Sequence, residues 1–195
     1  MLVDFFFGAG SRYSYLASTQ LRKIAAETGA TFVWRPLFSG ELITRAGGVF
    51  KSPQDTAYRS QDAARWARHY GVPYVEPQGH PDWRVAAQVC VAAARLGAAE
   101  QFGAAVLELV YGQGVAPQLE HLLALASRCN VDRDELSAGI DDPKTTAAHE
   151  RNVVDALAVG AFGVPTFVTE RGDVVWGQDR LPLLKDCILQ GDVSA

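Results

Sequence analysis

Residues 2–16, LVDFFFGAGSRYSYL, decide the fold of this chain. Aromatic and β-branched residues over 2–7 predict a buried strand, and the Gly-Ala-Gly that follows predicts a turn. Small hydroxyl residues from Ser11 to Ser14 stand where the next helix should begin, and we expect Ser14 to cap that helix. Hydroxyls and free backbone N–H groups at a helix start make a site for an anion such as a thiolate or a carboxylate. The stretch therefore predicts a strand, a turn and a helix with a candidate anion site at the helix start.

The next segments complete a β–α–β unit. Apolar and small residues at helical spacing over 14–28 stop at Gly29, which predicts a helix. Residues 31–38 are rich in strand-forming residues, and Pro36 marks the strand end. This order implies two parallel strands joined by a right-handed crossover. Residues 39–53, with three glycines, predict an irregular loop.

A long helical block separates this unit from a second piece that contains strands. Helical periodicity and capping residues predict helices over 57–70, 83–96, 100–111 and 117–128, with a short helix after Asp132. The chain then predicts a helix over 143–159, a hairpin of strands 166–169 and 174–176, and a final helix over 181–190.

These pieces predict one α/β domain that is interrupted by helices. Residues 1–39 and 142–195 form the α/β part, and residues 40–141 form an all-α insertion. The Val164–Pro165 pair opens the hairpin, where a proline does not interrupt a central ladder. A strand–helix unit at the front and a Val-Pro hairpin at the back predict a thioredoxin-like fold, βαβ…αββα, with Ser11 where a redox cysteine would stand. Ligand sites favour the carboxyl ends of parallel strands and the crevice between lobes, which makes Ser11 a candidate site residue.

The composition bounds the class of protein. Hydrophobic residues make up 48% and charged residues 21% of the 195 residues, as in ordinary soluble proteins. No apolar run approaches the roughly 20 residues of a membrane span, and the N-terminus lacks the pattern of a signal peptide. A formal net charge of −4 without a basic run argues against nucleic acid. We therefore expect a cytoplasmic protein that binds neither membranes nor nucleic acid.

Cysteine and histidine spacings predict no metal site. Cys90, Cys129 and Cys187 are far apart, without a C-x-x-C motif, and we expect buried apolar residues in a reduced compartment. The four histidines show no ligand spacing either. Three of the tryptophans are expected in the core or at an interface, namely Trp34, Trp83 and Trp176.

Five motifs together resemble the 2-hydroxychromene-2-carboxylate isomerases. They are SRYSYLA at 11–17, Arg65-Trp66, Gly71-Val72-Pro73, GVPTF at 163–167 and WGQDRL at 176–181. The similarity runs over nearly the whole chain in the right order, including the inserted helices. That family is grouped with the kappa-class glutathione transferases in the DsbA-like branch of the thioredoxin superfamily, so the resemblance implies the same fold.

The resemblance implies roles for single residues. Ser11 falls on the family serine whose hydroxyl faces the sulfur of glutathione, which makes it the implied catalytic residue. Val164, before an implied cis Pro165, falls where the backbone pairs with the cysteinyl part of glutathione. Gln178 and Asp179 fall where the γ-glutamyl group binds. Asp179 at a helix start can also accept from backbone N–H groups and face an ammonium.

Three positions depart from the family pattern. Arg12 stands where the family commonly has proline, and the loop over 47–51 lacks the common asparagine. Asp55 stands where the family tends to have lysine. The last two changes remove glutathione-binding groups and place an acid near an anionic peptide. Arg12 and Lys51 are the candidates to compensate.

The resemblance implies a glutathione-dependent isomerase of small aromatic carboxylates that works as a homodimer. A thiolate would add to a conjugated double bond, allow rotation and then leave. The substrate carboxylate needs a cation, and the candidates are Arg12, Lys51 and Arg65. Two alternatives stay open: a kappa-like glutathione transferase or peroxidase, and a non-catalytic thioredoxin-like protein that binds peptides at Val164–Pro165.

Overall fold

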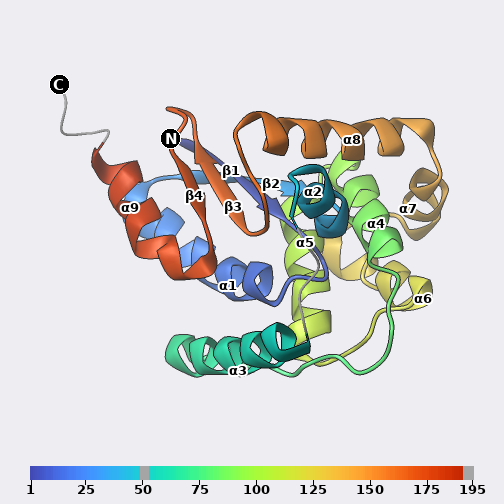
Figure 1. The fold of residues 1–195 in the computed structure, drawn as a ribbon. Coiled ribbons are helices and arrows are strands. Elements are labelled where there is room, and N and C mark those ends of the chain that lie inside the picture. Colours follow the sequence, from blue (N-terminus) through green and yellow to red (C-terminus); the bar gives the residue numbers. More distant parts are fainter. Residues whose placement is uncertain (49–52, 191–195) are drawn as a thin grey trace.

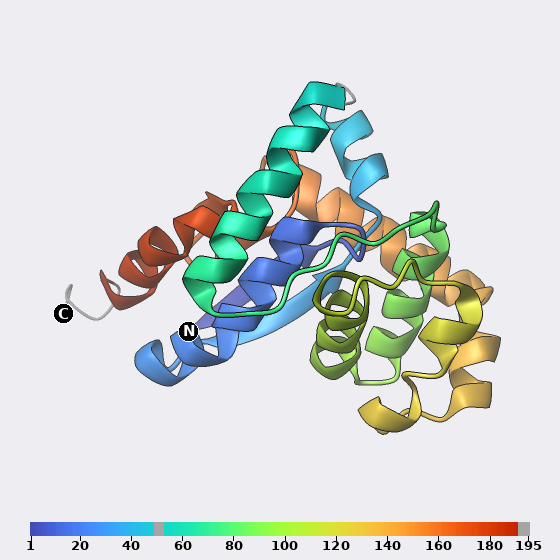
Figure 2. The same ribbon diagram turned by 90° about the horizontal axis from the view of Figure 1, so that it is seen from below.

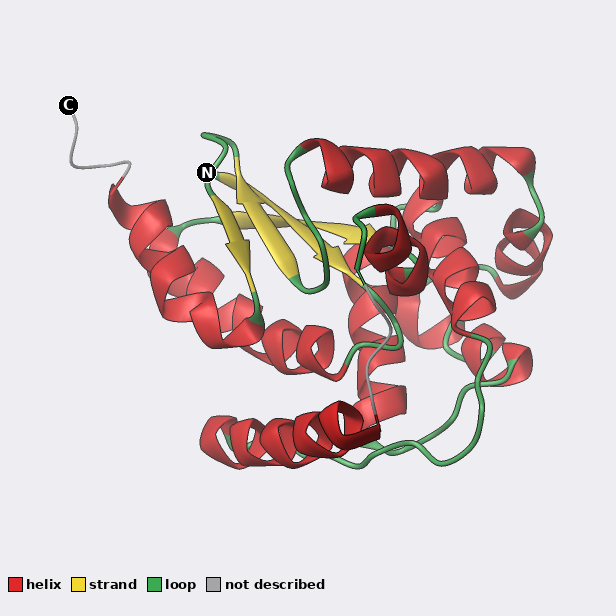
Figure 3. Ribbon diagram, viewed as in Figure 1, coloured by secondary structure: helices red, strands yellow, loops and turns green. Residues whose placement is uncertain are grey.

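A computed structural model describes residues 1–48 and 53–190 of the chain. Its centre is a four-stranded sheet with helices on both faces (Figures 1 and 3). The strand order is β2-β1-β3-β4, with bounds β1 Leu2–Phe7, β2 Thr31–Pro36, β3 Thr166–Thr169 and β4 Val174–Trp176. β1 pairs parallel with β2 and antiparallel with β3, and β3 pairs antiparallel with β4. The predicted parallel β–α–β unit and the C-terminal hairpin are confirmed.

Helices form the rest of the regular structure. Their bounds are α1 Arg12–Thr28, α2 Ser39–Arg45, α3 Pro53–Tyr70, α4 Trp83–Arg95, α5 Ala99–Leu107, α6 Leu119–Leu123, α7 Arg133–Ile140, α8 Pro143–Ala158 and α9 Leu181–Gln190. A π-helical turn extends α5, and two short 3-10 turns stand elsewhere: η1 Glu108–Gly112, η2 Ser127–Cys129 and η3 Gln178–Arg180.

β1 lies inside the sheet and presents alternate side chains to its two faces. Phe5 and Phe7 enter the larger core, to which α1 and α9 contribute. Phe6 enters a smaller core on the other face, together with Val153 of α8. Figure 1 shows α8 on one side of the sheet and α1 and α9 on the other. The aromatic run at the N-terminus is therefore the wall that the two cores share.

The helices from α3 to α7 share the larger core with the sheet. Phe102 of α5 is buried in the same cluster as Phe7 and Trp34. Gly103 allows this close approach, because a Cβ there would lie 2.7 Å from the Phe7 ring. Figure 2 shows α3 (teal) beside α1 (blue), with α4 to α7 (green to gold) grouped at one end. These helices and the sheet form one continuous core, and the insertion boundaries at 40 and 141 stay a prediction.

The expected loop over 39–53 is wrong in its first part, because α2 forms there. Glu41 and Arg45 pair at 3.3 Å across one helical turn. Leu42 is fully buried in the smaller core. Burial of this leucine against α8 outweighs the low helix propensity of the glycines that suggested a loop.

The other helices match their predictions apart from their ends. α1 begins at Arg12, two residues earlier than expected, and α3 begins at Pro53. The helix expected over 100–111 is α5 followed by the π-helical turn, and the one expected over 117–128 is the short α6 followed by η2. Three aspartates that precede helices accept from backbone N–H groups of the first turn: Asp82, Asp132 and Asp142.

Within residues 1–48 and 53–190, no helix is long and apolar enough to cross a membrane. No group of three or more His, Cys, Asp or Glu side chains in the same part of the chain could hold a metal ion. Cys90 and Cys129 are buried as expected, and Cys187 is half-buried. Burial raises the pKa of the Cys90 thiol to about 12, so this thiol is not ionised at neutral pH.

Candidate active site

Ser11 caps α1 and faces a loop from the other end of the chain. Its hydroxyl accepts a hydrogen bond from the Ser14 N–H at 3.1 Å. The same hydroxyl donates to the Val164 carbonyl at 3.5 Å, which is at the limit of a hydrogen bond. The expectation that Ser14 caps this helix is wrong. Ser14 is buried, and its hydroxyl accepts from the Gly8 N–H at 3.4 Å. The turn over residues 8–10 ends early enough for Ser11, not Ser14, to precede the first helical residue.

The loop opposite Ser11 contains a cis peptide bond between Val164 and Pro165. The predicted cis bond, and its position across from Ser11, are therefore confirmed. β3 begins only at Thr166, so Val164 lies outside the strand ladder. Among the described residues, no backbone carbonyl accepts from the Val164 N–H. Its C=O faces Ser11, and its N–H is left without a backbone acceptor among the described residues.

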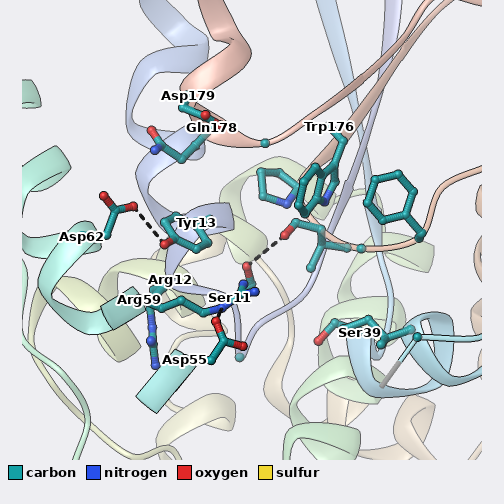
Figure 4. A pocket seen from close by; sticks show the side chains of 18 of the residues that line it. Ser11, Arg12, Tyr13, Ser39, Asp55, Arg59, Asp62, Trp176, Gln178 and Asp179 are labelled. Atoms are coloured by element: carbon teal, nitrogen blue, oxygen red, sulfur yellow. Dashed lines mark hydrogen bonds and ion pairs between the residues drawn. The ribbon is translucent and has the colours of Figure 1, made fainter. Parts of the chain in front are cut away.

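That space is a pocket of about 570 Å³ with two different walls. One wall is apolar and includes Ile43, Phe162, Pro165 and Trp176. The other wall is polar and carries Arg12, Tyr13, Asp55, Arg59, Asp62 and Asp179. In Figure 4, Trp176 lies on one side of Ser11, and Arg59, Asp55 and Asp62 lie on the other. The pocket fits a ligand that is partly apolar and partly charged.

Gln178 and Asp179 line the pocket from η3, just before α9. Gln178 is buried, and its side-chain oxygen accepts from the Tyr70 hydroxyl at 2.8 Å. Burial and the Asp179 charge raise the pKa of Tyr70 to about 12, so this hydroxyl stays a donor. Because the amide oxygen faces Tyr70, the amide NH₂ of Gln178 is the group left for a ligand. Asp179 is exposed and pairs with Arg180 at 2.8 Å.

Arg12 reaches the pocket wall and is held there by an acid from a distant loop. One guanidinium nitrogen lies 2.7 Å from a Glu76 carboxylate oxygen, and another donates to the Thr56 carbonyl at 3.4 Å. Glu76 also accepts from the hydroxyls of Ser60 and Tyr74. This network fixes the Arg12 head group and neutralises much of its charge.

Arg59 is a second cation on this wall, and the sequence did not single it out. Its Nε lies 2.9 Å from a carboxylate oxygen of Asp55, one turn earlier in α3. The acid that departs from the family pattern therefore has its own counter-charge. Arg65 is exposed, donates to Gln61 and does not line the pocket, because it projects from another side of α3. Lys51 lies outside the described residues.

Tyr13 and Asp62 form a hydrogen-bonded pair on the polar wall. The Tyr13 hydroxyl donates to an Asp62 carboxylate oxygen at 3.0 Å (Figure 4). Burial, followed by the bond to Asp62, raises the pKa of Tyr13, so its proton stays committed to the acid. The Tyr13 oxygen can therefore only accept a further hydrogen bond.

The chain matches one known protein family over nearly its whole length. The model of the DsbA-like thioredoxin domain matches residues 2–189. A 2-hydroxychromene-2-carboxylate isomerase from Pseudomonas putida is 32% identical over 96% of this chain and 94% of its own length. The isomerase of that name from Sphingobium xenophagum is 29% identical over 96% of this chain and 97% of its own length. The chain belongs to the DsbA-like thioredoxin family, in the group of these isomerases.

Solved structures agree with this placement in the DsbA-like family. A 2-hydroxychromene-2-carboxylate isomerase structure superposes with a TM-score of 0.84 and 28% identity, covering 100% of both chains. The disulfide reductase DsbM from Pseudomonas aeruginosa, solved with GSH, has a TM-score of 0.68 and 19% identity over 100% of both chains. The second likeness shows the shared fold alone.

In this DsbA-like domain, the position predicted for Trp176 is wrong. We expected Trp176 in the core or at an interface, but the side chain is 45% exposed and lines the pocket. β4 is an edge strand in which only Val175 points into the core, so its two neighbours point outward. Alternation within the Val-Val-Trp strand was the available signal.

Arg59 had a signal in the sequence too, since it stands one turn after the unusual Asp55. The Tyr13–Asp62 pair depends on how α1 and α3 pack, and the sequence carried no signal for it.

Proposed function

We propose that this protein is an isomerase of the 2-hydroxychromene-2-carboxylate type that uses glutathione bound beside Ser11. The named relatives support the reaction type. The observation that supports glutathione as the cofactor concerns the Ser11 hydroxyl. This hydroxyl is fixed as the N-cap of α1, yet its bond to the Val164 carbonyl is 3.5 Å long. A hydroxyl proton held so loosely can turn toward an anion in the pocket.

The residues of the pocket suit a short anionic peptide such as glutathione. The N–H and C=O of Val164 can pair with an extended peptide backbone, as a strand edge does. The Gln178 amide can donate to a carboxylate, and Asp179 can accept from an ammonium. These groups would hold the γ-glutamyl end.

Arg59 is the cation that we propose for binding the carboxylate of the substrate. Its partner Asp55 lies on the same helix, and such i,i+4 pairs contribute only about 0.2–0.5 kcal/mol. A ligand carboxylate can therefore share or replace that contact at small cost. Arg12 is less available, because Glu76 and a backbone carbonyl hold its guanidinium. We propose Arg59 in the place of Arg65, which lies outside the pocket.

When bound, glutathione would supply a thiolate nucleophile for the conjugated double bond of the substrate. A free thiol has a pKa of about 8.5, so only a few per cent is ionised near neutral pH. The first N–H groups of α1 have no acceptor within the helix, and α1 begins beside this site. Together with the Ser11 hydroxyl they favour a negative charge there, and one pKa unit corresponds to about 1.4 kcal/mol.

The interconversion of 2-hydroxychromene-2-carboxylate and its open-chain isomer, followed by absorbance with and without glutathione, tests the proposal. We expect conversion that rises with glutathione concentration and saturates. Conversion at the same rate without any thiol would refute glutathione as the cofactor but would still support the isomerase activity. No conversion under either condition, with glutathione binding intact by calorimetry, would favour a transferase or a peptide-binding protein.

A further inference from the structure

Two large aromatic side chains are exposed at the apolar wall of the pocket. Phe162 is 53% exposed and Trp176 is 45% exposed, and both line the pocket. Their ring centroids are 4.7 Å apart with an interplanar angle of 49°. Leaving two aromatic rings in water forgoes the free energy of their burial, unless a ligand covers them.

The backbone holds this aromatic pair in place. Phe162 lies two residues before Val164, and Trp176 lies two residues before Gln178. A Cβ added to Gly163 would lie 2.9 Å from the Trp176 indole nitrogen, so the indole rests closely against the loop at this glycine. The aromatic pair is thus fixed to the two segments that carry the ligand site, and little ordering is needed when a ring binds.

The position of the pair relative to Ser11 and the charged wall defines what it can bind. In Figure 4, Ser11 stands between Trp176 on one side and Arg12, Arg59 and Asp55 on the other. Ser11 lines the same pocket as both groups, so a ligand that covers the aromatic pair and reaches the charged wall can lie beside the Ser11 hydroxyl. A flat ring, a short unsaturated link and a carboxylate, in that order, match this sequence of groups.

We propose that Phe162 and Trp176 form the subsite that binds the aromatic ring of the substrate and selects aromatic over aliphatic carboxylates. The inference rests on the proposed isomerase function and deepens it. Ring faces and edges attract other aromatic rings with centroids about 4.5–7 Å apart, an attraction that an aliphatic chain of equal size lacks. The two residues therefore determine specificity, whereas Ser11 serves the reacting centre.

Calorimetric titration with trans-2-hydroxycinnamate, a planar aromatic carboxylate, tests the subsite without requiring activity. The titration is made without glutathione, so that no nucleophile for turnover is present. We compare wild type with Trp176→Leu and Phe162→Leu, and with Trp176→Phe, which keeps a ring. Leu183→Ala, at a side chain that is 55% exposed on α9 and outside the pocket, is the matched control for loss of an exposed apolar group. Hexanoate is the aliphatic ligand, and circular dichroism checks that each variant is folded.

We expect about tenfold weaker cinnamate binding in both leucine variants, near wild-type binding in Trp176→Phe and Leu183→Ala, and weak hexanoate binding throughout. Exposed Trp176 should also report cinnamate binding by a change in emission that Trp176→Leu lacks. Equal cinnamate affinity in wild type and both leucine variants, or no cinnamate binding to wild type, would overturn the subsite. If the subsite holds but 2-hydroxychromene-2-carboxylate is not isomerised, the proposed function fails and the aromatic subsite stands.

Discussion

Ser11 has a structural task as the N-cap of α1, and the proposed function gives the same hydroxyl a chemical task. As N-cap it accepts from the Ser14 N–H at 3.1 Å, which fixes its oxygen at the start of α1. Its proton remains loosely engaged with the Val164 carbonyl at 3.5 Å. A cysteine at this position would offer a thiol of its own, whereas a serine offers a donor to a sulfur brought by a ligand. The residue therefore suits a protein in which the thiol comes from outside.

Asp179 offers a direct test of the proposed ammonium contact. Asp179→Asn keeps the size of the side chain and removes its charge, so we expect glutathione affinity to fall about tenfold or more. A hydrogen bond to a charged group contributes roughly 1.5–3 kcal/mol, which corresponds to that range. Calorimetry measures the change.

Asp186→Asn on α9, outside the pocket, is the control for loss of one negative charge and should bind as wild type does. Equal affinity in Asp179→Asn and wild type would mean that Asp179 does not face the ligand.

His149 predicts how stability depends on pH. Burial lowers the pKa of His149, and its Nε2 accepts from the Phe38 N–H at 2.9 Å, which requires a neutral ring. The unfolded chain takes up this proton near pH 6.5, but the folded chain resists it. The contribution of His149 to the free energy of unfolding is therefore fully present above about pH 6.5 and is lost as the pH falls below this value.

Denaturant unfolding at a series of pH values measures this dependence. His149→Gln keeps an acceptor for the Phe38 N–H and cannot be protonated, so its unfolding free energy should change less between pH 7 and pH 5 than that of wild type. Parallel curves for the two proteins would show that His149 does not contribute.

At the scale of elements, the sequence predicted strands and capped helices well. The aromatic run at 2–7, the Asp132 cap and the Val-Pro hairpin each carry a local signal, and each element formed as expected. α2 was not predicted, because its stability comes from Leu42, which packs against α8 residues more than a hundred positions away in the sequence. Local patterns cannot report a contact that exists only after folding.

The packing of α5 on the sheet can be tested at Gly103. A Cβ there would lie 2.7 Å from the Phe7 ring and 3.0 Å from the Trp34 ring, both in the core. Gly103→Ala should therefore destabilise the protein by about 1–3 kcal/mol, the usual cost of overpacking. Denaturant unfolding measures the loss.

Gly139 is the matched control, because it also lies within a helix but has its nearest side-chain atom at 3.6 Å, an ordinary contact. Gly139→Ala should be neutral or stabilising by up to about 1 kcal/mol, as alanine favours helices. Destabilisation of equal size in both variants would show that the close approach at Gly103 is not the cause.

At the scale of the whole molecule, the sheet and the inserted helices share their core. Phe5, Phe7 and Trp34 from the sheet lie in one buried cluster with Phe102 and Val106 from α5. We therefore expect one cooperative unfolding transition instead of separate transitions for sheet and helices. Tryptophan emission, partly from Trp34 at this junction, and far-ultraviolet circular dichroism should give the same midpoint. Two resolved midpoints would show that the helical insertion folds as a separate unit.

The site was predictable where it follows the chain and unpredictable where it depends on packing. Ser11, Val164, Gln178 and Asp179 were implied by the resemblance of their local motifs to the isomerase family, and the fold brings all four to one pocket. The cations did not follow in this way. Arg59 and Arg65 are six residues apart on α3 and therefore point about 120° apart around the helix axis. Which of them lines the pocket depends on how α3 packs against α1, and the pocket has Arg59.

The pKa of the glutathione thiol in complex with wild type and with Ser11→Ala is the most direct test of the central claim. Thiolate absorbance measured across pH reports that pKa without turnover. We predict a pKa below that of free glutathione in wild type, and a pKa about one unit higher in Ser11→Ala, since the α1 N–H groups keep part of the effect. Turnover in the variant should fall most near neutral pH. An identical thiol titration and pH profile in the two proteins would contradict the account and leave Ser11 as a helix cap alone.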